Sequence, residues 1–205
     1  MQQSQIPVKP AEAEISEKNS RFLAILTPVA SEDDIRHIIE SLRQAHPKAN
    51  HVVSASRLAG EIHPQEGFSD DGEPSGTSGM PVLKQLQHAG VVNALLCVVR
   101  YFGGTKLGTG GLQRAYSQSA RAVLEMAGNS AGLAPYQPQY PARLMCSFQD
   151  QSAIRRQLAL YNAQVISETF NTEGVILDIE AGKTDLMQIE ECVLAEFHTA
   201  QIETD

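Results

Sequence analysis

The chain has 205 residues and a net charge of −8, with 42% hydrophobic and 20% charged residues. This length suits one large domain or two small ones, and the composition is typical of a soluble globular protein. The longest apolar run, residues 91–99, is too short to cross a bilayer, and the polar first 20 residues lack the apolar segment of a secretory signal.

The three cysteines, Cys97, Cys146 and Cys192, are far apart and each lies among apolar residues. They provide neither a disulfide framework nor the spacing of a metal site, so each is interpreted as a buried thiol. We therefore expect a cytoplasmic protein in a reducing compartment, with no cofactor, no metal and no membrane association.

The first part of the chain predicts strands around one helix. In order, we expect a loose end or edge strand over 1–10, a short strand end over 12–17, a strand over 20–28, a helix after Ser31, a strand over 50–58 and a polar loop over 59–66. Ser31 and Asp34 form a capping box, and the helix ends at Pro47. Its apolar stripe consists of Ile35, Ile38, Ile39 and Leu42.

The central stretch, residues 67–116, holds ten of the chain's 15 glycines. Glycine lowers helix and strand stability by roughly 0.5–1 kcal/mol per position, so this density indicates that backbone shape matters here. We expect a helix from about Pro81 to His88, a strand over 91–101 that is covered on both faces, and a glycine loop that opens a helix to about Met126, ended by Gly128.

The last third predicts a second domain after a linker. Residues 131–141 contain three prolines and few apolar side chains, so we place the boundary there, between domains over 1–132 and 140–205. The order beyond it is strand, helix, strand, strand, helix, strand, which is the ferredoxin-like pattern. The expected elements cover 142–148, 151–161, 163–170, 175–181, 185–197 and 199–203.

Charge is unevenly distributed along the chain. Residues 1–134 hold 12 basic and 13 acidic residues, a net charge of −1, whereas residues 135–205 hold 4 and 11, a net charge of −7. The overall negative charge argues against a protein that coats nucleic acid non-specifically. Residues 74–124, however, contain five basic residues and no acid, and this cationic window overlaps the glycine loops.

The first loop, residues 67–79, gathers acids and hydroxyls. Its acids are interpreted either as ligands of a divalent cation that bridges to phosphate or as turn and cap residues. Its hydroxyls either contact phosphate or cap the next helix, and no G-x-S-x-G nucleophile motif is present. The candidates are Asp70, Asp71, Glu73, Ser75, Thr77 and Ser78.

The second loop precedes a helix, whose first N–H groups are suited to cradling an anion. The same glycines are equally interpreted as a tight packing turn, because neither the P-loop nor the dinucleotide-binding spacing is present. The candidates are Gly103, Gly104, Gly108, Gly110 and Gly111, with Arg100, Lys106 and Arg114 as phosphate partners or ion-paired side chains and Tyr101 as a stacking or core aromatic. His51 and His63 form no metal-binding motif.

Two runs of the central stretch resemble the YigZ/IMPACT family: FSDDGEPSGTSG at 68–79 and RYFGGTKLGTGGL at 100–112. The motif at 114–116 and Ser20-Arg21-Phe22 also fit. The resemblance implies an α+β N-terminal domain similar to domain 2 of a small-subunit ribosomal protein, and a ferredoxin-like domain similar to the last domain of elongation factor G. The family has no firmly assigned reaction, so the resemblance implies none for this chain. Eukaryotic members regulate translation, which implies a looser link to translation for a bacterial-type chain.

Two functional hypotheses follow. In the first, the chain is a non-catalytic binding or regulatory protein whose cationic loops contact RNA, the ribosome, a translation factor or a phosphate-like anion. In the second, it is an enzyme acting on a phosphorylated metabolite or nucleotide, with Asp70 and Asp71 holding Mg²⁺. We favour the first, because no complete set of catalytic residues can be assembled from the sequence.

Overall fold

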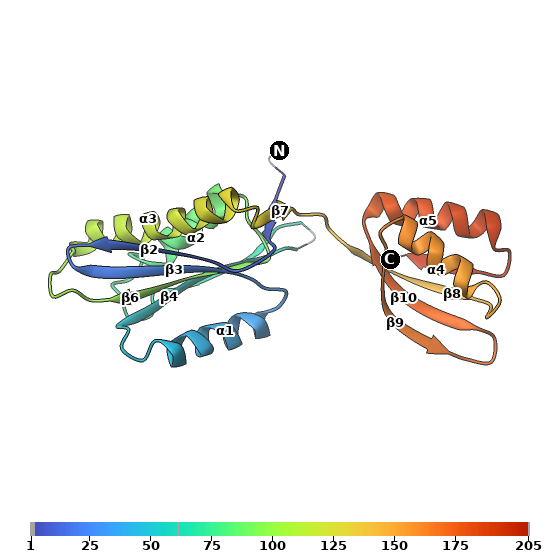
Figure 1. The fold of residues 1–205 in the computed structure, drawn as a ribbon, viewed down its shortest axis with the longest axis horizontal. Helices are drawn as coiled ribbons and strands as arrows, with labels where there is room; N and C mark the ends of the chain where they lie inside the picture. Colours follow the sequence, from blue (N-terminus) through green and yellow to red (C-terminus); the bar gives the residue numbers. More distant parts are fainter. Residues whose placement is uncertain (1–2, 61, 205) are drawn as a thin grey trace. The chain divides into compact units, whose positions relative to one another are not determined.

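The computed structural model describes residues 3–60 and 62–204 of the chain. The chain forms two compact units, residues 1–136 and residues 137–205, each with its own hydrophobic core (Figure 1). Both units are mixed α+β, as the sequence predicts. None of the helices among these residues is long and apolar enough to cross a membrane.

The first unit is built on a five-stranded antiparallel sheet in the order β2-β3-β6-β4-β5. Its elements are β1 (Gln5–Pro7), β2 (Ala11–Glu17), β3 (Ser20–Pro28), α1 (Glu32–Ala45), β4 (His51–Leu58), β5 (Gln65–Ser69), α2 (Gly79–His88), β6 (Ala94–Tyr101), α3 (Gly108–Asn129) and β7 (Leu133–Pro135). Strand β7 lies in the segment expected to be a linker, where it pairs with β1.

Helices cover both faces of this sheet, α2 and α3 on one side and α1 on the other (Figure 1). Every residue of β6 except the last is buried, as its continuous apolar run predicts for a doubly covered strand. Phe22 and Val98 face α2 and α3, whereas Ile25 and Val99 face the α1 side. The alternation of side chains along each strand therefore decides which helix layer a residue meets.

The start of α1 confirms the capping box. The Ser31 hydroxyl accepts a hydrogen bond from the Asp34 backbone N–H at 3.2 Å, and the Asp34 carboxylate accepts one from the Ser31 N–H at 3.1 Å. These two bonds satisfy N–H groups that would otherwise lack partners at the helix N-terminus.

Three expected boundaries differ from the structure. Strand β6 begins at Ala94 rather than residue 91, because Asn93 adopts a φ of 50° and its side chain accepts from the Ala59 N–H. Strand β5 occupies part of the expected polar loop 59–66. Helix α3 continues through Gly128 and ends at Asn129, and the φ of 51° at Ala131 lets the Gly132 N–H bond back to the Ala127 carbonyl.

The second unit confirms the ferredoxin-like order of elements. These are β8 (Tyr140–Cys146), α4 (Gln151–Leu160), β9 (Gln164–Phe170), β10 (Val175–Ala181), α5 (Lys183–Glu196) and β11 (Gln201–Thr204). The antiparallel sheet runs β11-β8-β10-β9. Buried and partly exposed residues alternate strictly along β10, because one face of the sheet carries the helices.

Candidate anion-binding cleft

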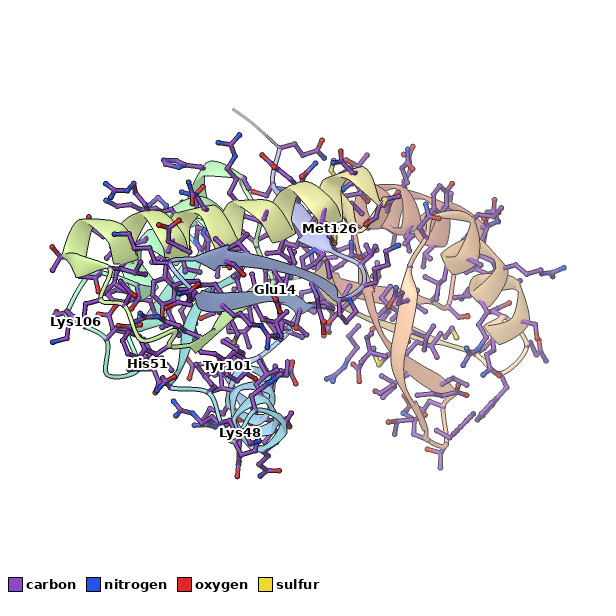
Figure 2. All side chains as sticks on the ribbon, turned by 60° about the vertical axis from the view of Figure 1, so that its left-hand side comes forward. Glu14, Lys48, His51, Tyr101, Lys106 and Met126 are labelled. Carbon is purple, nitrogen blue, oxygen red and sulfur yellow. The ribbon has the colours of Figure 1, made fainter. Side chains whose placement is uncertain are left out.

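A cleft of about 490 Å³ opens in the first unit where β4 begins, β6 ends and α3 begins. It brings together parts of both glycine loops, which come from opposite ends of the central stretch. Its lining consists of Asn50, His51, Glu73, Pro74, Arg100, Phe102, Lys106, Leu107, Gly108, Thr109 and Leu112. Figure 2 shows Lys106 and His51 at the end of the unit where α3 starts, and Met126 near the other end of that helix.

Strand register determines which polar side chains reach the cleft. Arg100 on β6 lies opposite Phe22 on β3 and opposite His51 on β4. Directly opposed residues of an antiparallel sheet point to the same face, so Arg100 and His51 lie on the side that α2 and α3 cover.

A buried carboxylate, Glu73, anchors the wall of the cleft. Its Oε1 accepts hydrogen bonds from Arg100 Nη1 at 2.5 Å and from the Tyr116 hydroxyl at 2.7 Å. Only 3% of the Glu73 side chain and 6% of the Arg100 side chain are exposed. Burial of two charges costs free energy unless they are paired, and here each neutralises the other.

The Arg100 guanidinium is held by aromatic rings as well as by Glu73. Its central carbon lies 5.4 Å from the centre of the Phe22 ring and 5.6 Å from that of Phe102. Arg100 Nε is buried and has no hydrogen-bond partner among the described residues. Because a buried donor without a partner is costly, this atom is an unsatisfied polar group on a side chain that lines the cleft.

Tyr116 remains a hydrogen-bond donor to Glu73 at all ordinary pH values. Burial raises the pKa of the Tyr116 hydroxyl far above its usual range, and the hydrogen bond to the Glu73 carboxylate raises it further. The Tyr116 ring also packs edge-on against Phe22, with ring centres 5.2 Å apart. Tyr116 therefore stabilises the carboxylate without taking part in proton exchange.

His51 belongs to the cleft, although the sequence gives it no motif. Its Nδ1 lies 2.7 Å from the Asp71 carbonyl oxygen and its Nε2 lies 3.8 Å from Glu73 Oε1. A carbonyl only accepts, so Nδ1 carries a proton and donates it to this hydrogen bond. Only the β4–β6 register, which places His51 opposite Arg100, identifies His51 as a cleft residue, and this register cannot be read from the sequence.

Asp70 organises the first loop rather than facing the cleft. Its Oδ1 accepts from the Ser78 hydroxyl at 2.6 Å and from the Gly79 N–H at 2.8 Å, and its Oδ2 accepts from the Gly76 N–H at 2.8 Å. Burial alone would raise the pKa of Asp70, but these bonds outweigh it and hold the pKa below its usual range. Asp70 thus caps α2 across the loop.

Asp71 also bonds to the protein around it. Its Oδ2 accepts from the Val52 N–H at 2.6 Å, and its Oδ1 pairs with Arg43 at 2.5 Å. In the part of the chain that the structure describes, no cluster of three or more His, Cys, Asp or Glu side chains is arranged to hold a metal ion. The two aspartates therefore fit the interpretation as turn and cap residues.

The three hydroxyls of the first loop do not line the cleft. Thr77 Oγ1 donates to the Pro74 carbonyl at 2.6 Å, and the Ser78 hydroxyl donates to Asp70 instead of accepting at the N-terminus of α2. Ser75 is exposed. Thr77 and Ser78 therefore form hydrogen bonds within the loop, and Ser75 lies at the surface. The Asp70 carboxylate, rather than one of these hydroxyls, caps the start of α2.

The glycines of the second loop have separate roles. A methyl group on Gly103 would lie 2.0 Å from the backbone of Asn19, so this position is a tight packing contact. Gly104 and Gly108 adopt φ values of 86° and 70°, which strain other residues. Gly110 and Gly111 lie in the first turn of α3, which no side chain caps.

Two cations flank that first turn. Lys106 lines the cleft and is exposed, and within residues 3–60 and 62–204 it makes no hydrogen bond or ion pair. The nearest side-chain atom to a methyl group placed on Gly110 would be Arg114 Nη1, at 3.9 Å. Arg114 is exposed and is not among the residues that line the cleft. Lys106 and the uncapped N–H groups of α3 add positive charge beside the Arg100–Glu73 pair.

Tyr101 and Arg121 lie away from the cleft. The Tyr101 hydroxyl is 2.7 Å from His46 Nδ1, and the Arg21 guanidinium lies 5.1 Å from its ring centre, so Tyr101 belongs to the α1 side of the sheet (Figure 2). Arg121 pairs with Glu125 on the exposed surface of α3, about 20 Å along the helix from its start.

Residues 18–124 match the model of a family described as the Impact N-terminal domain. Over 166 residues the chain is 34% identical to IMPACT family member YigZ of Escherichia coli (strain K12), covering 80% of this chain and 79% of that protein. It is 42% identical to IMPACT family member YvyE of Bacillus subtilis (strain 168) over 58% of this chain and 55% of the relative. A crystal structure described as that of an hypothetical protein matches with a TM-score of 0.75 and 30% identity, covering 98% of this chain and 97% of that one.

Proposed function

Because the chain belongs to the IMPACT family, we propose that it is a non-catalytic binding protein linked to translation, and that its N-terminal cleft holds phosphate groups of RNA. The family resemblance supports the link to translation. The cleft supports the ligand class, and one observation carries it: a buried arginine with an unpartnered Nε lines the same cleft as the uncapped start of α3.

The balance of charge in the cleft favours an anion. Arg100 and Glu73 neutralise each other, and Lys106 makes no ion pair within residues 3–60 and 62–204, so its charge is available to an anion. The first N–H groups of α3 add a partial positive charge of about half a unit. A phosphate oxygen at this position accepts from Lys106 and the helix terminus together, which is a recurrent way to bind phosphate.

The magnesium-dependent alternative is less favoured. Both carboxylate oxygens of Asp70 and of Asp71 already accept hydrogen bonds or pair with a cation. Coordination of Mg²⁺ by these residues would remove the cap of α2 and the bonds that tie the first loop to β4. Those losses are a cost that a binding role does not incur.

The test is a titration of the full chain into a fluorescently labelled single-stranded RNA, followed by anisotropy at two salt concentrations. Counterion release makes affinity fall with salt, with a log–log slope of roughly −0.7 per phosphate neutralised on a single strand. We expect Lys106→Ala combined with Arg114→Ala to weaken binding and to reduce the size of that slope by up to about two contacts' worth.

The matched control is Lys84→Ala combined with Arg121→Ala. It removes the same charge from exposed positions of α2 and α3 outside the cleft, so any change it causes measures the overall charge alone. Absence of binding at low salt, or binding that responds equally to both double variants, would contradict the proposal.

A further inference from the structure

Resting on the proposed function, a second observation narrows the ligand. Phe102 follows β6 directly, lines the cleft, and leaves 45% of its surface exposed. A single exposed aromatic side chain is ordinary on a protein surface. This one shares its cleft with Arg100, Lys106 and the start of α3, which are the groups expected to meet a phosphate.

Phe102 is held in place from two sides. Its backbone N–H donates to Asn50 Oδ1 at 2.8 Å, which fixes the chain at the root of the side chain. The Arg100 guanidinium lies 5.6 Å from the centre of its ring. An aromatic side chain with a fixed root and an exposed surface loses little conformational entropy when another ring packs against it.

We propose that the cleft binds unpaired RNA, with one base stacked on Phe102 and a neighbouring phosphate at Lys106 and the first turn of α3. Bases of a duplex are stacked inside it and cannot reach an aromatic side chain beside a phosphate site, whereas an unpaired base can. The cleft volume of about 490 Å³ is in the range of pockets that hold one small organic unit, which here is a nucleotide.

The test compares wild type and Phe102→Leu as full chains against three probes of equal length: a single-stranded RNA, an abasic strand with the same phosphates, and a duplex RNA. Base–aromatic stacking predicts that Phe102→Leu weakens single-stranded RNA binding about fivefold or more. The abasic strand should bind both proteins equally and more weakly than RNA binds to wild type. Duplex RNA should be insensitive to the substitution.

Two further variants make the result specific. Phe102→Tyr keeps an aromatic ring and should restore single-stranded binding to near the wild-type value. Phe148→Leu, at an exposed phenylalanine of the second unit, should change nothing.

The outcomes separate this inference from the proposed function. If wild type binds all three probes in a salt-dependent way and Phe102→Leu binds them equally well, stacking is overturned while phosphate binding stands. Duplex binding as tight as that of single-stranded RNA also overturns stacking. If no probe binds wild type at low salt, the proposed function fails and the inference fails with it.

Discussion

Glu73 sits among groups that depend on its negative charge. One of its oxygens accepts from both Arg100 and Tyr116, and its side chain is almost wholly buried. A carboxylate in this position stabilises the fold, because it compensates the buried guanidinium. The same charge opposes an anionic ligand in the cleft that it lines, so stability and binding depend on it in opposite directions.

We therefore predict that Glu73→Gln lowers the free energy of unfolding and strengthens RNA binding at low salt. Breaking a buried ion pair by neutralising one partner costs about 3–5 kcal/mol, because the other charge stays buried without compensation. Urea denaturation measures the first effect and fluorescence anisotropy the second. Glu125→Gln is the control: it neutralises an exposed carboxylate paired with Arg121 and should cost less than about 1 kcal/mol. Equal behaviour of the two variants would contradict the prediction.

At the scale of single residues, the sequence indicates which side chains carry charge, but not which face of a strand each side chain occupies. Arg100, Lys106 and Glu73, which the sequence offered as candidates, line the same cleft. Tyr101 was grouped with them, yet it follows Arg100 in a strand, and neighbouring strand residues point to opposite faces. His51 was missed because only the β4–β6 register places it opposite Arg100.

At the scale of elements, α2 depends on a residue far outside it. Asp70 accepts from the N–H groups of Gly76, Ser78 and Gly79 and from the Ser78 hydroxyl, and it thereby closes the first loop onto the start of the helix. A cap eight residues before the N-cap position is invisible to local sequence patterns, which look for Ser, Thr, Asp or Asn at that position.

We predict that Asp70→Asn destabilises the protein by about 1–2 kcal/mol at neutral pH and that this deficit disappears in acid. The pKa of Asp70 is depressed in the folded protein, so its contribution is complete above the unfolded value of about 3.9 and is lost as pH falls through the lower folded value. Urea midpoints of both proteins between pH 7 and pH 2 measure it, and the difference should narrow as the pH falls below about 3.9. Glu12→Gln, at an exposed position of β2, should show no such convergence. A pH-independent difference for Asp70→Asn would rule out the charged cap.

Elements with internal periodicity were predicted well, and elements defined by distant partners were not. The capping box of α1, strand β3 and strand β10 have the expected positions because their signals are local. Strand β5 is an exposed edge strand with no buried residue, so it lacks the alternation that marks a strand. Strand β7 forms only because β1 is available to pair with it.

At the scale of the whole molecule, two cores divide the chain. The order of the second unit could be predicted because its pattern of strands and helices is a known motif. The strand order of the first unit could not, because β3 and β6 lie side by side although about 70 residues separate them in the sequence. Only the family resemblance pointed to that architecture.

We predict that the two units unfold separately, with residues 137–205 unfolding first, because the smaller unit buries a smaller fraction of its surface. Cys97 reports on the first core and Cys146 on the second, and both are buried. Burial raises the pKa of the Cys97 thiol to about 12 and also raises that of Cys146, so neither reacts while its unit is folded. Pulsed alkylation across a urea series, read by mass spectrometry, should show two midpoints.

Cys192, which is only partly buried, provides the internal control in the same experiment. It should be alkylated no later than Cys146, since both belong to the second unit. Coincident midpoints for Cys97 and Cys146 would mean that the chain unfolds as one cooperative unit and that the division at 136–137 has no energetic meaning.

The contact between Gly103 and Asn19 has a consequence for the kinetics of recognition. The β2–β3 turn at Lys18 and Asn19 and the second glycine loop are packed backbone against backbone, with no side chain between them that could adjust. Because Gly103 follows Phe102, this contact fixes the backbone next to a residue that lines the cleft. If the cleft binds RNA as proposed, we expect association in a single step, at a rate set by diffusion and by the attraction of the nearby cations. Differences in affinity between ligands would then come mainly from differences in dissociation rate.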